Sequence, residues 1–167
     1  MILYHGGFSE ISKPEILELQ RAMDFGGGFY TTTSFEQAKK WALTKKDRFH
    51  YENAVVSSFT FDMNLLDSTN LKFKIFKTAN EEWLDFIMNN RHTLNFEFDF
   101  DIVYGAVAND NVYASLNLYE DGFLSKTQLM EELRTWKYVD QLCFHTTKAL
   151  NYLTFEKSEK VFKEETK

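Results

Sequence analysis

The sequence predicts a single α+β domain in which short strands and separated helices are mixed. Three observations carry this prediction. The 167 residues are 44% hydrophobic and 17% aromatic, a composition that requires a buried core. Several short runs have the alternation of strands, and three other segments begin with helix-capping residues. The order of these segments is irregular, which is typical of an α+β domain and not of a βαβ repeat.

Alternation of apolar and polar residues, or short β-branched and aromatic runs, predicts the strands. The expected strands cover residues 1–5, 29–33, 54–61, 71–76, 102–108, 139–145 and 154–157. Residues 96–102 also alternate, either as a strand or as an extended approach to the strand that follows. The sequence Asn109-Asp110-Asn111 predicts a turn after that strand.

Capping boxes predict where three helices begin, because Ser or Thr three residues before Glu or Gln satisfies free backbone donors of the first turn. These helices and a short fourth one are expected at residues 34–44, 78–91, 125–136 and 148–153. Residues 8–23 fit either a short helix or a compact loop. Four lysines near the first helix are expected to form a solvated face: Lys39, Lys40, Lys45 and Lys46.

The domain is expected to span residues 1–157, followed by a charged C-terminal tail at 158–167. A net charge of −6 and a pI near 5.3 disfavour a generic surface for polyanions. One cysteine, Cys143, excludes an internal disulfide and a cysteine-based zinc site, and the scattered histidines give no metal spacing. No apolar stretch reaches 18 residues and the N-terminus does not read as a signal peptide, so we expect a cytoplasmic protein without a membrane span.

Familiar catalytic signatures are absent from the sequence. No P-loop, nucleophile elbow or zinc-protease motif occurs, and the glycines at 26–28 precede a strand, which is the wrong order for a Rossmann site. Cys143 and His145 share a strand face, but side chains two apart on a strand diverge by about 7 Å of rise. A buried structural cysteine is therefore favoured over a nucleophile.

Three short sequence motifs, or blocks, taken in their order along the chain, form a recognisable set. The first is Tyr4-His5-Gly6-Gly7, and the second runs from Asp24 through Gly26-Gly27-Gly28-Phe29-Tyr30-Thr31-Thr32 into a helix containing Gln37-Ala38 and Trp41-Ala42. The third is the strand that begins at Asp140-Gln141. Alone, the glycine run fits an ordinary hinge before a strand. As a set, the blocks resemble the ADP-ribosyltransferase superfamily in its His-Tyr-Glu branch, and the chain is similar to small bacterial domains of that superfamily over about residues 1–155.

The resemblance implies a split β-sandwich of two mainly antiparallel sheets with peripheral helices. It implies NAD as co-substrate, no metal, and transfer of ADP-ribose through an oxocarbenium-like cation as nicotinamide leaves. The implied catalytic residues are His5, Tyr30 and Gln141. The implied NAD-binding residues are His5, Gly6, Gly28, Tyr30, Thr31 and Thr32. In this reading Tyr30 supplies a ring for the nicotinamide, the glycines leave room beside it, and Gly6 offers backbone hydrogen bonds.

The third block departs from the family pattern, because Gln141 stands where the pattern has Glu. An amide can bind a ribose hydroxyl but brings no charge and cannot act as a base. Three other carboxylates are candidates to supply the charge: Asp24, Asp110 and Asp140. The expected acceptor is a protein or a nucleic acid, and the likeness to toxins and effectors implies a cognate antitoxin as a possible partner. The alternatives are a silent binding module on the same fold, an RNA 2′-phosphotransferase-like use of NAD, and an unrelated α+β domain.

Overall fold

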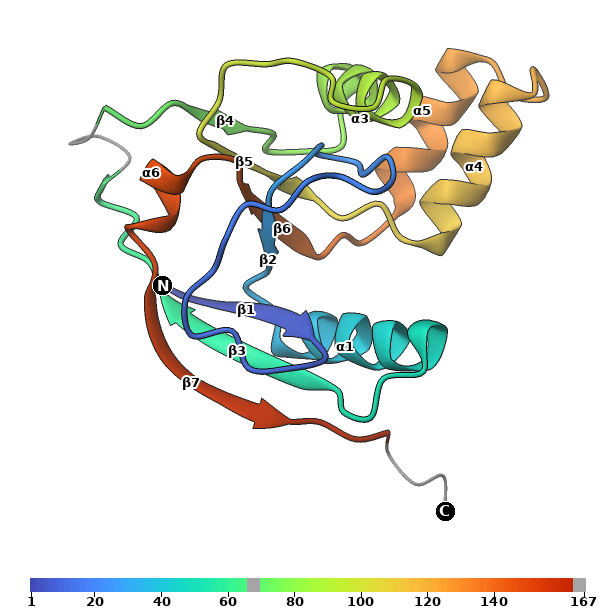
Figure 1. Cartoon of the computed structure of the whole chain (residues 1–167). Coiled ribbons are helices and arrows are strands. Elements are labelled where there is room, and N and C mark those ends of the chain that lie inside the picture. The colour runs from blue at the N-terminus through green and yellow to red at the C-terminus, as the bar shows by residue number, and fades with distance from the viewer. Residues whose placement is uncertain (66–69, 164–167) are drawn as a thin grey trace.

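Two β-sheets with helices packed against them make up the protein, in a computed structural model that describes residues 1–65 and 70–163 (Figure 1). The first sheet has the order β1-β3-β7, with strands at Ile2–Gly7, Val55–Thr60 and Thr154–Lys160. The second has the order β2-β6-β5-β4, with strands at Phe29–Thr31, Asp140–Phe144, Ile102–Ala106 and Phe73–Ile75. Among the strand pairs of the described residues, only β4–β5 is parallel. The predicted α+β class with two mainly antiparallel sheets is confirmed.

The helices within the described residues are α1 (Phe35–Phe49), α3 (Glu81–His92), α4 (Asp110–Glu120), α5 (Lys126–Thr135) and α6 (Thr147–Leu150). Ser34 and Ser125 cap α1 and α5 as predicted. The cap of α3 is Asn80, whose side chain accepts from the Trp83 N–H, and not the predicted Thr78. The turn predicted at 109–111 is wrong. Asn109 caps α4 instead, because its side-chain oxygen accepts from the backbone N–H groups of Asn111 and Val112.

Some predicted elements are absent from the structure, and others are longer than predicted. Residues 8–28 contain no helix or strand, so the loop reading of 8–23 holds, and residues 93–101 lead into β5 without forming a strand. By contrast, α1 continues past the predicted end at Thr44, and β7 continues past Lys157 to Lys160. Ser158 pairs with Ser57, so the start of the predicted charged tail is part of the sheet. The end of that predicted tail, residues 164–167, lies outside the described residues.

Apolar side chains form three clusters that fix the layers. Between the two sheets lie side chains such as Leu3 and Phe59 from the first sheet and Leu142 and Phe144 from the second. On the far face of the second sheet, Trp83 and neighbouring side chains pack it against α3, α4 and α5. On the far face of the first sheet, Ala38 and Ala42 of α1 pack against Val56. No helix among the described residues is long and apolar enough to cross a membrane.

Candidate functional site

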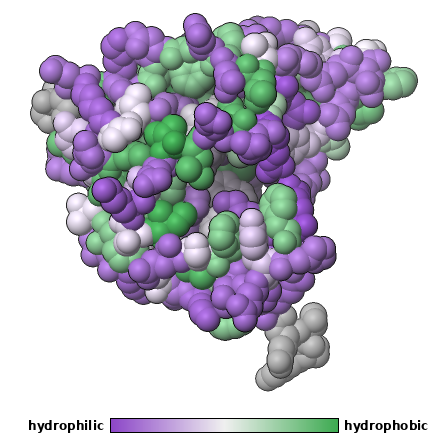
Figure 2. Space-filling view, in the orientation of Figure 1, coloured by the Kyte–Doolittle hydropathy of each residue, from purple (hydrophilic) through white to green (hydrophobic). Residues whose placement is uncertain are grey.

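The two sheets meet where β1 runs beside β2. The Tyr4 N–H donates to the Thr32 carbonyl oxygen at 2.8 Å, and the Thr32 N–H donates back to Tyr4 at 3.0 Å. We call this region the β1–β2 junction, formed by Tyr4, His5, Gly6, Tyr30 and Thr32. The space-filling view is hollowed beside it, between the second sheet and α1 (Figure 2). Because alternate residues of a strand direct their backbone groups to one edge, the Gly6 N–H and C=O face the same edge as those of Tyr4.

His5 bonds directly to the backbone of Tyr30. Its Nδ1 lies 2.7 Å from the Tyr30 carbonyl oxygen, which can only accept, so Nδ1 carries the proton and Nε2 is left as an acceptor. The imidazole stacks on Phe29 with the ring centroids 4.4 Å apart. Burial, helped by the nearby charge of Lys45 and opposed by the bond to Tyr30, lowers the pKa of His5 to about 3. His5 is therefore neutral near pH 7, with Nε2 bonded to no other described residue.

Tyr30 turns its side chain to the opposite face of β2 from Phe29. Its hydroxyl donates to the Gly26 carbonyl oxygen at 2.7 Å and accepts from the Phe25 N–H at 3.1 Å. The ring is half-buried against the helix-side cluster, and burial raises the pKa of Tyr30 well above its usual range. Tyr30 thus holds the end of the 8–28 loop against β2, whatever further role its ring has.

Gln141 lies on the same face of the second sheet as Tyr30. Tyr30 is opposite Cys143 in the β2–β6 pair, and Gln141 precedes Cys143 by two residues. The Gln141 side chain is 3% exposed, and its Nε2 donates to the Ala106 carbonyl oxygen at 3.3 Å. The fold therefore brings Tyr30 and Gln141 to one face of neighbouring strands. It ties His5 to the Tyr30 backbone while the imidazole rests on the other face, against Phe29.

The hydroxyl groups of the two predicted threonines, Thr31 and Thr32, form hydrogen bonds within the protein. Both are 0% exposed. Thr31 Oγ1 donates to the Leu142 carbonyl oxygen at 3.2 Å, and Thr32 Oγ1 donates to Asp140 Oδ1 at 3.2 Å while accepting from the Ser34 N–H. Their contacts join β2 to β6 and to the start of α1, so a direct hydroxyl contact with a ligand would require one of these bonds to open.

At the predicted glycines, the space that a side chain would need is filled by other parts of the protein. A Cβ on Gly6 would lie 2.1 Å from the Ala38 carbonyl oxygen of α1, and one on Gly28 would lie 2.5 Å from the Phe144 carbonyl oxygen of β6. Gly26 has φ +76°, a conformation that favours glycine. These residues bring α1 and β6 close to the β1–β2 junction.

The three candidate carboxylates have different surroundings. Asp24 accepts from the Tyr113 hydroxyl at 2.9 Å through both oxygens, and burial raises the pKa of Asp24. Asp140 accepts from the Thr33 N–H at 2.9 Å and from the Thr33 hydroxyl at 2.7 Å. Asp110, at the start of α4, has a side chain that is 95% exposed and lies 3.9 Å from Lys40 Nζ of α1. Of the three, Asp110 has the carboxylate most open to a ligand.

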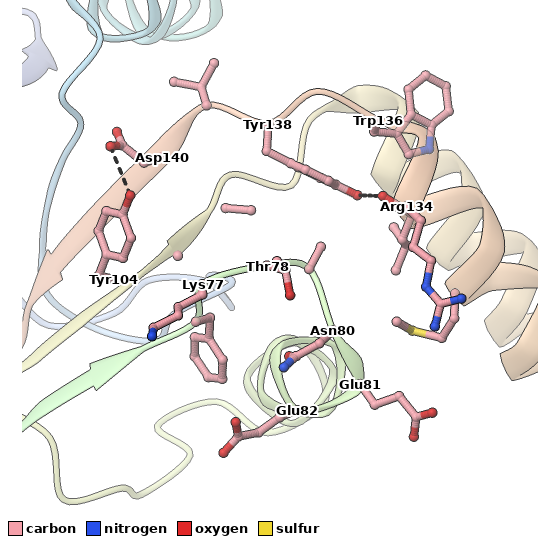
Figure 3. Close-up of a pocket in the computed structure, with 17 residues that line it drawn as sticks. Lys77, Thr78, Asn80, Glu81, Glu82, Tyr104, Arg134, Trp136, Tyr138 and Asp140 are labelled. Atoms are coloured by element: carbon pink, nitrogen blue, oxygen red, sulfur yellow. Dashed lines mark hydrogen bonds between the residues drawn. The ribbon is translucent and has the colours of Figure 1, made fainter.

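A cavity of about 740 Å³ lies on the other side of Asp140, between β5, the start of α3 and the end of α5 (Figure 3). Tyr104, whose hydroxyl lies 3.5 Å from Asp140 Oδ2, lines it together with Trp136 and Tyr138. Two other acidic residues of its lining, Glu81 and Glu82, are paired with lysines. None of the predicted catalytic residues lines this cavity, and Asp140 is its link to the β1–β2 junction.

Sequence reasoning missed Lys45, which was expected on a solvated face. Its Nζ donates to the Gly6 carbonyl oxygen at 2.7 Å, and burial, with repulsion from Arg21, lowers the pKa of Lys45 to about 8. The signal was its spacing: Lys45 follows the buried Ala38 and Ala42 by seven and three residues, so it continues the stripe that faces β1.

The junction, with a neutral imidazole and backbone groups at the meeting of two sheets, defines a candidate site for a polar ligand. The chain belongs to a family of proteins of unknown function, DUF3990, whose sequence profile matches residues 1–155. No curated protein matches the chain.

Proposed function

We propose that this protein is an NAD-dependent mono-ADP-ribosyltransferase with the split β-sandwich of the ADP-ribosyltransferase superfamily. It would transfer ADP-ribose from NAD to a protein or nucleic acid acceptor, release nicotinamide, and act as a bacterial toxin or effector. The contact that supports this most is the bond from His5 Nδ1 to the Tyr30 carbonyl oxygen, which joins the first two blocks of the motif. Gln141, from the third block, lies on β6, two residues before Cys143, which is opposite Tyr30.

His5 and Gly6 have the properties that the proposal needs for binding NAD. With its proton on Nδ1, His5 presents Nε2 as an acceptor for a ribose hydroxyl. The Gly6 N–H and C=O face the same edge and suit the carboxamide of nicotinamide, which both donates and accepts, because the carbonyl oxygen has a second lone pair beside the one that accepts from Lys45. In the reaction the bond between ribose C1′ and the nicotinamide nitrogen breaks, with its electron pair leaving on nicotinamide. The acceptor then bonds to C1′ and loses its proton.

The charge of the ribosyl cation needs a negative group that Gln141 does not supply. Asp110 is the candidate we favour, because its carboxylate is exposed and ionised carboxylates near a developing cation stabilise it. Asp24 and Asp140 are already bound by Tyr113 and by the Thr32–Thr33 segment. Asp110→Asn should therefore lower transfer more than Asp24→Asn, when both variants are compared at equal folded fraction.

A second candidate function, a silent NAD-binding or interaction module on the same fold, is favoured by one observation. The Gln141 amide is buried and already donates to Ala106, so it contributes neither charge nor a free donor without rearrangement. Binding of NAD with no nicotinamide release, together with no label transfer in lysate, would favour this module over the enzyme.

The deciding assay incubates the protein with labelled NAD and cell lysate, and measures nicotinamide release and label transfer. The proposal expects both from the wild type and neither from His5→Ala. The matched control is His92→Ala, because His92 is exposed and distant in sequence from the motif. Equal output from wild type, His5→Ala and Tyr30→Ala would refute the enzyme. Slower growth on expression of wild type, relieved by Tyr30→Ala, tests the toxin reading, and relief by a co-expressed neighbouring gene would identify an antitoxin.

A further inference from the structure

Lys45 is a half-buried cation without an acidic partner. It reaches from α1 across to β1, where its Nζ donates to the Gly6 carbonyl oxygen at 2.7 Å. A half-buried ammonium is costly unless a negative group compensates it. No carboxylate within 1–65 and 70–163 forms an ion pair with Lys45. The group is therefore held in the protein with part of its hydrogen-bonding capacity and all of its charge unmatched.

A second cation adds to this charge. Arg21, exposed on the loop between β1 and β2, is close enough to repel the Lys45 ammonium, and this repulsion adds to burial in lowering the pKa of Lys45. The other charged or titratable groups that face the pair are few. His5 is neutral near pH 7, and Asp24, which also feels Arg21, has a raised pKa and a Tyr113 hydroxyl across both oxygens. The neighbouring charge that acts on Lys45 is therefore a second cation, although the chain carries a net charge of −6.

Lys45 lies next to both residues that are proposed to contact NAD, so its charge can act on a bound ligand. Lys45 touches Gly6, where nicotinamide is proposed to bind, and its charge also acts on His5, where a ribose is proposed to bind. In NAD the diphosphate connects the two ribosides. A dinucleotide bound at both residues would therefore have its two negative phosphates near the Lys45 ammonium.

We propose that Lys45, with Arg21 beside it, is the anchor for the diphosphate of the bound dinucleotide, an inference that rests on the function proposed above. A compact ammonium with free donors suits phosphate oxygens, and the charge of Arg21 adds to their attraction. On binding, the phosphates supply the counter-charge that Lys45 lacks. Lys45 is in this view a binding residue and takes no part in bond breaking.

Calorimetric titration with ADP-ribose, inorganic pyrophosphate and nicotinamide tests the anchor. Losing a charge-assisted hydrogen bond lowers affinity on the order of tenfold or more. We expect Lys45→Ala to lose that factor for ADP-ribose and pyrophosphate while keeping its affinity for nicotinamide. Lys45→Arg should retain most of the binding. The matched control is Lys46→Ala, which removes the same charge from the next residue of α1.

The pH dependence of the wild type gives a readout that does not depend on whether Lys45→Ala folds. Because the pKa of Lys45 is lowered to about 8, the ammonium is present at pH 7 and is lost as the pH rises through 8. Wild-type affinity for ADP-ribose should fall between pH 7 and 9, whereas that of Lys45→Arg should stay nearly constant. A flat wild-type profile would overturn the anchor.

The outcomes separate the two proposals. If wild type binds NAD and Lys45→Ala binds it equally, the anchor is wrong and the proposed function stands. Pyrophosphate binding that depends on Lys45, without any binding of NAD, keeps the anion site and removes the NAD-dependent function. If wild type binds neither ADP-ribose nor pyrophosphate, both proposals fail.

Discussion

Replacing Gly6 by alanine should destabilise the protein, because the added methyl group would collide with the backbone of α1. The added Cβ would lie 2.1 Å from the Ala38 carbonyl oxygen and 2.9 Å from the Ala42 nitrogen, where ordinary contact begins near 3.4 Å. Helix α1 would have to retreat from β1 by about 1 Å or more, because helix backbone cannot rotate aside as a side chain can. That retreat would loosen Ala38 and Ala42, both 0% exposed, against the first sheet.

The cost lies at the upper end of what overpacking produces, about 3 kcal/mol. For a chain of this size, that corresponds to a fall in Tm of about 6–12 °C. Differential scanning calorimetry measures it directly. The control is Gly122→Ala, since Gly122 has φ +80° but no atom within 4 Å of its added Cβ, so only the conformational cost of about 1 kcal/mol remains. A Tm for Gly6→Ala within about 2 °C of wild type would refute this reasoning.

Three further predictions concern single groups. His5 should stay neutral in an NMR titration down to about pH 4. Because its folded pKa of about 3 lies below the unfolded value of 6.5, its contribution to stability is full above pH 6.5 and declines toward pH 3. The His5→Asn substitution should therefore lower the urea midpoint less at pH 5 than at pH 7. An imidazole titrating near 6.5 would contradict this. The Cys143 thiol is 0% exposed and burial raises its pKa well above the usual range, so a thiol reagent should modify it only in urea; rapid modification of the native protein would show the burial to be wrong. Asp140→Asn should lower the free energy of unfolding in urea by about 1–2 kcal/mol, because an amide cannot accept from Thr33 through both of its terminal atoms. The control Glu131→Gln, at an exposed position, should change the free energy of unfolding little. Equal urea midpoints for the two variants would mean that the bonds to Thr33 do not stabilise the protein.

The fold class and most elements could be predicted because their signals are local. Ser34 and Ser125 mark the starts of α1 and α5 through contacts within four residues. The α4 helix was missed because Asn109 and the two residues after it have the same composition in a turn and in a helix cap. Only the packing of Val112 and Leu116 against the second sheet decides between them.

The site could be predicted in part, for a related reason. The order of the blocks placed His5 and Tyr30 together, and they do meet, but through the Tyr30 carbonyl group and not through its ring. This contact joins residues that are 25 positions apart, and it depends on how β1 lies beside β2, which no local sequence pattern encodes. Lys45 was misassigned because a lysine on a helix is normally solvated, and its burial follows from how closely Gly6 lets α1 approach.

The strand order has a consequence for when the protein can fold during its synthesis. In the first sheet the middle strand β3 pairs with β7, which is complete only at Lys160, and in the second sheet β6 pairs with both β2 and β5. Until these late segments have emerged from the ribosome, β2, β3 and β5 each lack a strand with which they pair in the folded protein. The β1–β2 junction therefore forms after β6 and β7 have emerged, and a chain cut before residue 140 lacks a strand of each sheet and should neither fold nor bind a ligand.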